Sequence, residues 1–267
     1  MKQDILTTFL NQNKDILLLK NRNNTIVAGP EYCLFRTYLK EILLSNLSKR
    51  YPSIKFIELS LPSSVNNTQL VESGYSKNFE LLNIEKSTRS LRPEIFATTY
   101  GELEDFKHFF GTEVCYYSIG TSFRNEKSTK KRVVRSFQFE QLEFQFYKSN
   151  IIKLEELVED LKLILSTFTH DFNNISTEIK NSSELPFYSN KTIDVVYNLH
   201  NSESTLELSS LSQRNERQVV ELSIGIARTF ITSMIDASKN KKEVGLYFLS
   251  NLSTKFTRKI FNSKIYN

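Results

Sequence analysis

Val133-Val-Arg-Ser-Phe-Gln-Phe-Glu-Gln-Leu-Glu-Phe-Gln-Phe-Tyr147 alternates almost strictly between apolar and polar side chains. A period of two is typical of a strand that buries one face in the core. Residues 112–120 are likewise rich in β-branched and aromatic side chains, and a polar loop at 125–132 separates the two runs. The stretch 112–147 therefore predicts two antiparallel strands of one sheet.

Helical and strand patterns continue on both sides of this pair. Apolar residues recur at helical spacing over 3–20, 31–49 and 152–168, and Gly29-Pro30 precedes the second run, where a proline favours a helix start. Strand patterns cover 54–61, 194–199, 204–209 and 219–225, the last running into a helix at about 227–237. Residues 171–184 are rich in Asn and Ser, which predicts a surface connection.

The order of these patterns predicts an α+β fold built around an antiparallel sheet. No internal repeat and no Pro- or Gly-rich linker divides the chain, so we expect one domain over 1–267. Within it we expect an N-terminal helix in 1–27 and a helical and loop insertion at 150–187.

Composition excludes several classes of protein. The 267 residues include only two cysteines and three histidines, which argues against a disulfide framework or a Cys/His zinc cluster and favours a reducing cytoplasm. No apolar run has the length of a signal peptide or a membrane span, so no membrane partner is expected. The seven glycines lack the spacing of a Rossmann or P-loop phosphate site, so side chains would have to hold any nucleotide.

The segment most informative about function begins with Phe123-Arg-Asn-Glu126. After eight intervening residues come Arg135, then Phe139 and Glu143 at intervals of four. This pattern resembles motif 2 of the class II aminoacyl-tRNA synthetases, and its spacing is similar to that of glycyl-tRNA synthetases.

Further segments resemble the same family in the same order. Leu91-Arg-Pro-Glu94 looks like the LRPE segment of glycyl-tRNA synthetases, and Glu207-Leu-Ser-Ser-Leu-Ser-Gln-Arg214 resembles their ELEGIANR segment. Glu221-Leu-Ser-Ile-Gly-Ile-Ala-Arg228 is similar to motif 3, and Gly29-Pro30 with the following helix is similar to motif 1. The resemblance covers roughly residues 28–235 and implies a six- or seven-stranded antiparallel sheet flanked by helices.

The resemblance implies an ATP site. Arg124 would meet the α-phosphate and Arg135 the γ-phosphate, because planar guanidinium groups pair well with phosphate oxygens. Phe139 and Arg228 would enclose the adenine ring, with Arg228 also reaching the γ-phosphate, and Glu126 would accept a hydrogen bond from its amino group. Either Glu207 or Glu143 would ligate Mg²⁺ through its carboxylate, and Glu207 is the expected ligand. Arg124 and Arg228 are the expected catalytic residues, and Glu207 is counted with the ATP-binding set.

The resemblance also implies an amino-acid site. Its members would be Glu94, Glu143, Arg214, Glu221 and Ser223, with carboxylates on the ammonium group and Arg214 on the carboxylate of the substrate. Several acidic groups around a small pocket leave little room for a side chain, so glycine or another small amino acid is expected.

The sequence also departs from the family. Ile95-Phe96-Ala97 replaces a usual Thr-Ala-Gln, Phe137 replaces an Arg, and Leu222 and Ala227 replace the Pro and Gly of motif 3. Only six residues separate Arg214 from Glu221, where the family carries a longer loop. About forty residues follow motif 3, so we expect no anticodon-binding domain.

Two functions follow from the resemblance. The chain is either an AMP-forming ligase or a non-catalytic synthetase paralogue that acts as a binding, accessory or regulatory subunit. The ligase would transfer the aminoacyl group to tRNA, a carrier protein or a small nucleophile. An isologous homodimer, formed through motif 1, is also expected.

Overall fold

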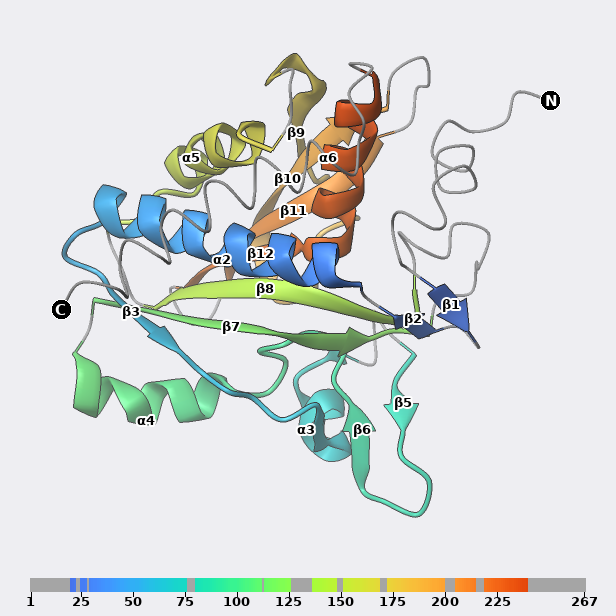
Figure 1. Ribbon diagram of the computed structural model, residues 1–267. Helices are drawn as coiled ribbons and strands as arrows, with labels where there is room; N and C mark the ends of the chain where they lie inside the picture. The colour runs from blue at the N-terminus through green and yellow to red at the C-terminus, as the bar shows by residue number, and fades with distance from the viewer. Residues whose placement is uncertain are drawn as a thin grey trace, which may run out of the picture.

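A seven-stranded sheet forms the centre of the computed structural model, in the order β3-β7-β8-β12-β11-β10-β9 (Figure 1). The model describes residues 20–22, 25–27, 29–75, 80–111, 113–125, 136–147, 151–168, 172–199, 205–214 and 219–239. The strands are β3 (Lys55–Glu58), β7 (Val114–Phe123), β8 (Gln138–Tyr147), β9 (Ile175–Ile179), β10 (Ser189–Asn198), β11 (Thr205–Arg214) and β12 (Val219–Gly225).

The sheet differs from the expected antiparallel one at one edge. Strand β3 pairs with β7 in parallel, while the other neighbouring strands are antiparallel. A long crossover separates β3 from β7 in the chain, and only a connection of that kind lets two strands run in the same direction. The fold is thus a mixed sheet flanked by helices.

The two stretches predicted as strands, 112–120 and 133–147, correspond to β7 and β8, although β7 continues to Phe123 and β8 begins only at Gln138. They pair in antiparallel register from Val114 opposite Tyr147 to Phe123 opposite Gln138. Leu142, Phe144 and Phe146 of β8 are fully buried in the main core. The polar residues between them therefore project from the opposite face of the sheet.

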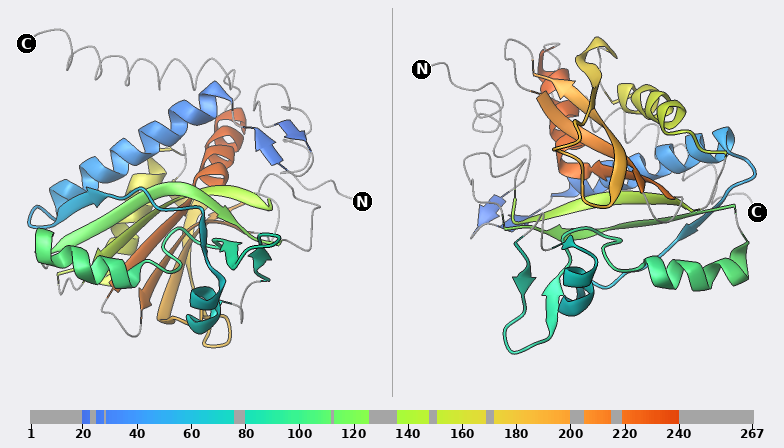
Figure 2. Two further views of the ribbon diagram at one scale, coloured as in Figure 1. Left: turned by 90° about the horizontal axis from the view of Figure 1, so that it is seen from below. Right: turned by 180° about the vertical axis from the view of Figure 1, so that it is seen from behind.

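Three helices cover the apolar face of the sheet (Figure 2). They are α2 (Pro30–Arg50), α5 (Leu154–Ser166) and α6 (Ile226–Lys239), which match the predicted helices at 31–49, 152–168 and 227–237. Pro30 stands in the first turn of α2, and Glu155 and Glu156 stand in the first turn of α5, where the helix dipole favours negative charge.

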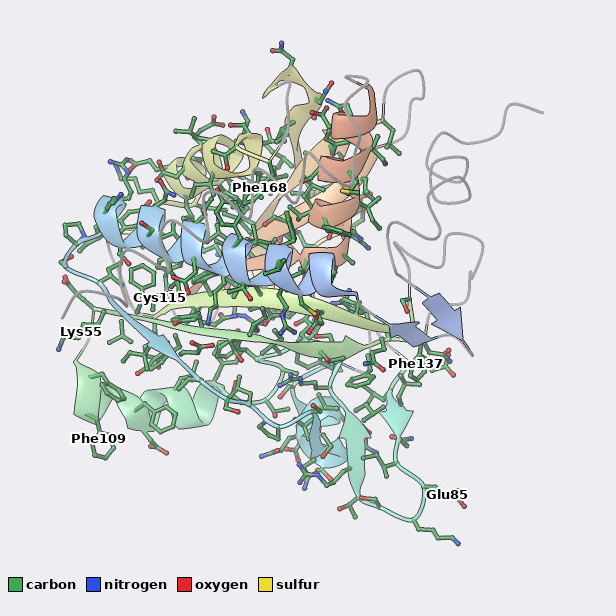
Figure 3. The ribbon with its side chains drawn as sticks, viewed as in Figure 1. Lys55, Glu85, Phe109, Cys115, Phe137 and Phe168 are labelled. Carbon is green, nitrogen blue, oxygen red and sulfur yellow. The ribbon has the colours of Figure 1, made fainter. Side chains whose placement is uncertain are left out.

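The other face carries a smaller layer of elements. It comprises α3 (Asn67–Glu72), α4 (Tyr100–Phe110) and a three-stranded sheet of β4 (Ser64–Asn66), β6 (Arg89–Leu91) and β5 (Leu82–Asn83). Phe109 of α4 points away from the sheet (Figure 3) and is 79% exposed. The segment between β6 and α4 buries Ile95 and Phe96, which brings the neighbouring Glu94 to the polar face of the sheet.

Two predicted segments turn out differently. Residues 20–22 and 25–27 form a hairpin, β1 (Lys20–Arg22) with β2 (Thr25–Val27), rather than part of the N-terminal helix predicted for 1–27. Residues 1–19 lie outside the described part. Within 171–184, a 3-10 turn (Phe172–Asn174) is followed by β9, which pairs with β10. Because β9 is an exposed edge strand, its polar composition resembles that of a loop, and the predicted surface connection therefore contains a strand.

Candidate active site

A cavity of about 250 Å³ lies on the polar face of the sheet. Its floor comes from Gln141 and Glu143 of β8, Glu221 and Ser223 of β12, and Asp194 of β10. Glu94, Arg124, Glu207 and Tyr188 also line it. The floor is polar because β8 and β12 pair with Glu143 opposite Ser223 and Gln145 opposite Glu221, so their polar side chains share one face.

Glu221 is the best-paired carboxylate of the site. Its Oε2 accepts from Nε and Nη2 of Arg214 at 3.0 and 2.8 Å, from the Tyr100 hydroxyl at 3.0 Å and from Nε2 of Gln145 at 3.0 Å. Burial by itself would raise the pKa of Glu221, but the Arg214 charge and these hydrogen bonds bring it below its ordinary value. Glu221 therefore stays ionised.

Glu143 is buried and accepts fewer hydrogen bonds than Glu221. Its carboxylate accepts from the backbone N–H groups of Ile95 and Phe96 at 3.2 and 3.3 Å. Burial, followed by the charges of Glu221 and Glu94, raises the pKa of Glu143 to about 8. The side chain is therefore close to its own titration point at neutral pH.

Glu94 joins the elements on either side of the cavity. Its Oε2 accepts from the Tyr75 hydroxyl at 2.9 Å and its Oε1 from the Tyr188 hydroxyl at 3.0 Å. Burial and the charge of Glu221 raise the pKa of Glu94, while Arg124 and Arg214 oppose the rise. Three carboxylates thus meet around one small cavity.

Arg214 lies behind the cavity. Its guanidinium carbon is 4.3 Å from the ring centre of Tyr100 and 3.7 Å from that of Tyr188. The side chain is 8% exposed, and it is not among the described residues that line the cavity. Nε and Nη2 both donate to Glu221, and two tyrosine rings lie against the guanidinium, so Arg214 does not face the cavity as its assignment to the substrate carboxylate implies.

Arg124 also lines the cavity. Its Nη2 lies 3.4 Å from Oε1 of Glu94, its Nε donates to the carbonyl oxygen of Pro93 at 3.1 Å, and its guanidinium carbon is 5.2 Å from the centre of the Phe139 ring. Arg124 directly follows the last residue of β7, and Phe139 is the second residue of β8. The antiparallel pairing of the two strands therefore brings these side chains together.

Arg228 lies in the first turn of α6, and its Nη1 donates to the carbonyl oxygen and to Oε1 of Glu207, both at 3.2 Å. Glu207 in turn lines the cavity. The pair therefore brings a second guanidinium close to the site. Glu126 and Arg135, the two other residues assigned to ATP, lie outside the described residues.

The structure thus brings most of the predicted residues together. Glu94, Arg124, Glu143, Glu207, Glu221 and Ser223 line one cavity. Phe139, Arg214 and Arg228 lie next to it through the contacts given above.

Sequence reasoning missed part of this site. Gln145 and Gln141 lie on the same face of β8 as Glu143, and the period of two would have identified both. Gln141 donates to Ser223 Oγ at 2.9 Å, while its buried Oε1 has no hydrogen-bond partner among the described residues.

No pattern in the sequence indicates the other residues of the site. These are Tyr188 and the ion pair of Lys180 with Asp194, at 2.8 Å. Burial and then Glu207 raise the pKa of Asp194.

Within the described ranges, no group of three or more His, Cys, Asp or Glu side chains is arranged to hold a metal ion. None of the helices in the described part has the length and apolar character needed to cross a bilayer.

Structural comparison identifies the fold. The chain superposes on prolyl-tRNA synthetase from Cryptosporidium parvum, complexed with halofuginone and AMPPNP, with a TM-score of 0.67 and 10% identity over 88% of this chain and 53% of the other. For the Giardia lamblia prolyl-tRNA synthetase in complex with prolyl-adenylate, the TM-score is 0.69 with 12% identity over 86% and 53%. The chain has the fold of a class II aminoacyl-tRNA synthetase core.

Sequence comparison narrows the resemblance. The chain is 26% identical over 201 residues to the glycine–tRNA ligase of Malacoplasma penetrans (strain HF-2), covering 63% of this chain and 43% of that protein. No protein-family model matches the sequence. The resemblance stated from the motifs is thus confirmed as that of a class II synthetase-like core, and the chain spans about half the length of the relatives it matches.

Proposed function

We propose that the chain uses ATP to activate a small amino acid and then passes the aminoacyl group to an acceptor. In the first step a carboxylate oxygen of the amino acid bonds to the α-phosphorus, the bond from that phosphorus to pyrophosphate breaks, and an aminoacyl-adenylate forms. The observation that carries the proposal is the cluster of Glu94, Glu143 and Glu221 in one cavity that Arg124 also lines.

The charge balance of the cluster favours an ammonium group. Three carboxylates face two guanidinium groups, those of Arg124 and Arg214, and among the described residues the hydrogen bonds to the Glu143 carboxylate come from backbone N–H groups and not from a cation. A ligand ammonium would supply the missing positive charge, and its binding would favour the ionised form of Glu143. Glu94 and Glu143 are the proposed ammonium ligands, with Ser223 beside them.

The nucleotide would lie between Arg124 and Arg228. Arg124 would stabilise the negative charge that develops at the α-phosphate, a role in which one preorganised donor contributes a factor of about 10² to 10³ in rate. The ring of Phe139 and the guanidinium of Arg228 would hold the adenine, and the resemblance adds Glu126 and Arg135 to the set.

Mg²⁺ fits only as a companion of ATP. The described residues hold no preformed cation site, but Mg²⁺ often uses one or two carboxylates together with substrate phosphates. Glu143 accepts two backbone N–H groups, whereas Glu207 is partly exposed beside Arg228. Glu207 is therefore the better choice of the two, and the chemistry supplied by the ion would be neutralisation of phosphate charge.

The relatives support the substrate class. The two solved prolyl-tRNA synthetases are complexes with AMPPNP and with prolyl-adenylate, and the sequence relative is a glycine–tRNA ligase. We propose glycine as the amino acid, because three carboxylates and Tyr188 crowd the cavity. A tRNA acceptor end, a carrier protein or a small nucleophile would receive the product, and α2 would mediate a homodimer.

A second function is favoured by the internal pairing of the site. Arg124 is paired with Glu94, and Arg214 lies between Glu221 and two tyrosine rings, so both guanidinium groups already have partners within the protein. Such a site suits a non-catalytic paralogue that keeps the fold for binding. Amino-acid-dependent exchange of pyrophosphate into ATP, measured with all twenty amino acids, distinguishes the two functions. The ligase is expected to catalyse exchange with glycine or another small amino acid. If no amino acid supports exchange, the chain is a non-catalytic paralogue.

A further inference from the structure

Tyr188 comes from a part of the chain that none of the synthetase-like motifs includes. It lies at the end of the segment between β9 and β10, immediately before Ser189 begins β10. Its side chain lines the cavity, and its hydroxyl donates to Oε1 of Glu94 at 3.0 Å. One face of its ring lies 3.7 Å from the guanidinium carbon of Arg214.

The position of Tyr188 is fixed by aromatic packing. Its ring centre is 4.9 Å from that of Phe187, which in turn is 5.1 Å from Tyr75. Gly74 has φ of +83°, and a Cβ there would lie 3.0 Å from the Phe187 ring. A glycine is thus required for both the backbone conformation and the close approach of Phe187. These contacts hold Tyr188 in the wall of the cavity.

The ring of Tyr188 separates the cavity from Arg214. Tyr100 also lies against the guanidinium, with its ring centre 4.3 Å from the guanidinium carbon, and the buried Tyr75 hydroxyl lies 3.5 Å from Nη2. Removing the ring would extend the cavity inward between Glu94 and Glu221 and would uncover a guanidinium face. The added space would accept a larger side chain, and the guanidinium would favour one that carries an oxygen.

We infer that Tyr188 is a specificity-determining residue that restricts the site to the smallest amino acids by filling the space over Arg214. This inference rests on the proposed function, because it concerns the amino acid that the site accepts. It adds a residue from outside the synthetase-like motifs to the substrate site.

The test compares the wild-type chain with Tyr188→Ala, Tyr188→Leu and Tyr188→Phe. Asn190→Ala, at an exposed position two residues away, is the control. Pyrophosphate exchange gives kcat/KM for glycine, alanine and serine. Tyr188→Ala should raise the ratios for alanine and serine over glycine by about 10- to 200-fold, the range that one methylene commonly contributes to discrimination. Tyr188→Leu should raise them by less.

Tyr188→Phe separates the ring from the hydroxyl. It keeps the aromatic ring in the wall of the cavity but removes the hydrogen bond to Glu94. The KM for glycine should therefore rise, while the kcat/KM ratios of alanine and serine over glycine stay near those of the wild type. A protein that merely lost packing would lose activity with all amino acids in parallel. Unchanged ratios in Tyr188→Ala and Tyr188→Leu, with unfolding temperatures showing both variants to be folded, would overturn the inference while leaving the proposed function intact.

Absence of exchange in the wild type would instead refute the proposed function. The size restriction by Tyr188 is then tested by measuring how much each amino acid, at a fixed concentration, raises the unfolding temperature. Stabilisation of Tyr188→Ala by alanine or serine, but not of the wild type, would support the size restriction. The same response in both proteins would exclude it.

Discussion

Nη2 of Arg124 lies 3.4 Å from Oε1 of Glu94, so a residue assigned to ATP and a residue assigned to the amino acid are paired with each other. Phosphate oxygens would compete for Arg124, and an ammonium group would compete for Glu94. Each ligand would therefore release the partner that the other one needs. The ion pair makes the two halves of the proposed site energetically dependent on each other.

The first prediction is that ATP and the amino acid bind with positive coupling. Calorimetric titration of glycine should give a lower Kd in the presence of a non-hydrolysable ATP analogue, by about 5- to 150-fold if the coupling is typical of linked sites. Glu94→Gln should weaken both the pair and the coupling. Equal glycine affinity with and without the analogue would contradict the role given to the pair.

Substitution of Arg124 is the most direct test of the nucleotide assignment. Arg124→Ala should reduce pyrophosphate exchange by about 10²-fold or more, because it removes a donor to the developing charge. The fold should persist, since Glu94 keeps its hydrogen bonds from Tyr75 and Tyr188.

Arg36→Ala is the matched control for Arg124→Ala. Arg36 forms an ion pair of 2.6 Å with Glu140 of β8, and both side chains are partly exposed. Glu140 lies between Phe139 and Gln141 in the strand, so it projects from the opposite face of the sheet. Exchange at wild-type rates is expected for Arg36→Ala; wild-type exchange by Arg124→Ala would remove Arg124 from the proposed mechanism.

The pKa of about 8 for Glu143 predicts a pH dependence of binding. Below that pH the carboxyl is mostly protonated and neutral, so it attracts an ammonium group weakly. The affinity for glycine should increase as the pH rises from about 6.5 to about 8.5, since ionisation of Glu143 restores the charge. In Glu143→Gln the affinity should be lower and this rise should disappear. An unchanged pH profile in the variant would assign the titration to another group.

The same pKa has the opposite effect on stability. The folded state holds a proton on Glu143 that the unfolded state, with an ordinary pKa of 4.5, releases earlier. The contribution of Glu143 is therefore fully present below about 4.5 and is lost as the pH rises towards about 8. Urea unfolding of the wild type and Glu143→Gln at several pH values should show the variant gaining relative stability over this window. Parallel curves would show that the group does not titrate there.

The sequence was informative wherever a pattern had a single physical meaning. The period of two in β8 predicted both its pairing with β7 and the separation of Phe144 and Phe146 from Glu143. The parallel pairing of β3 could not be predicted, because strand direction depends on the route of the crossover. Strand β9 was hidden by its polar composition, since an exposed edge strand and a loop use similar residues.

The candidate site also has a part that the sequence predicts and a part that it does not. Glu94, Glu143 and Glu221 were assigned by resemblance to motifs, and the fold brings these distant segments to one cavity. The enclosure of Arg214 by Tyr100 and Tyr188 could not be predicted, because it depends on tertiary packing between segments that share no local pattern. Sequence alone therefore indicates which groups carry charge, and the structure shows which charges meet.

The last prediction concerns the clamp that Arg92, two residues before Glu94, forms on three backbone carbonyl groups. Buried Arg92 donates from Nε to the carbonyl oxygen of Thr121 at 2.9 Å and from Nη1 to those of Leu61 and Pro62 at 3.0 and 3.1 Å. A Cβ at Gly120 would overlap Nη2 of Arg92, so Gly120→Ala must displace the clamp. Urea unfolding should show a loss of about 1–3 kcal/mol, as for other overpacked interiors.

Gly225→Ala provides the comparison, because its Cβ would have its nearest neighbours at an ordinary contact distance of 3.6 Å. Its effect on stability should be clearly smaller. Arg92 also links the segment that carries Glu94 to the end of β7, since its carbonyl oxygen accepts from the N–H of Phe123, the last residue of that strand, at 2.9 Å. Gly120→Ala should therefore also raise KM for the amino acid, because the Arg124–Glu94 pair depends on both segments. Equal losses in Gly120→Ala and Gly225→Ala would show that the clamp contributes nothing specific.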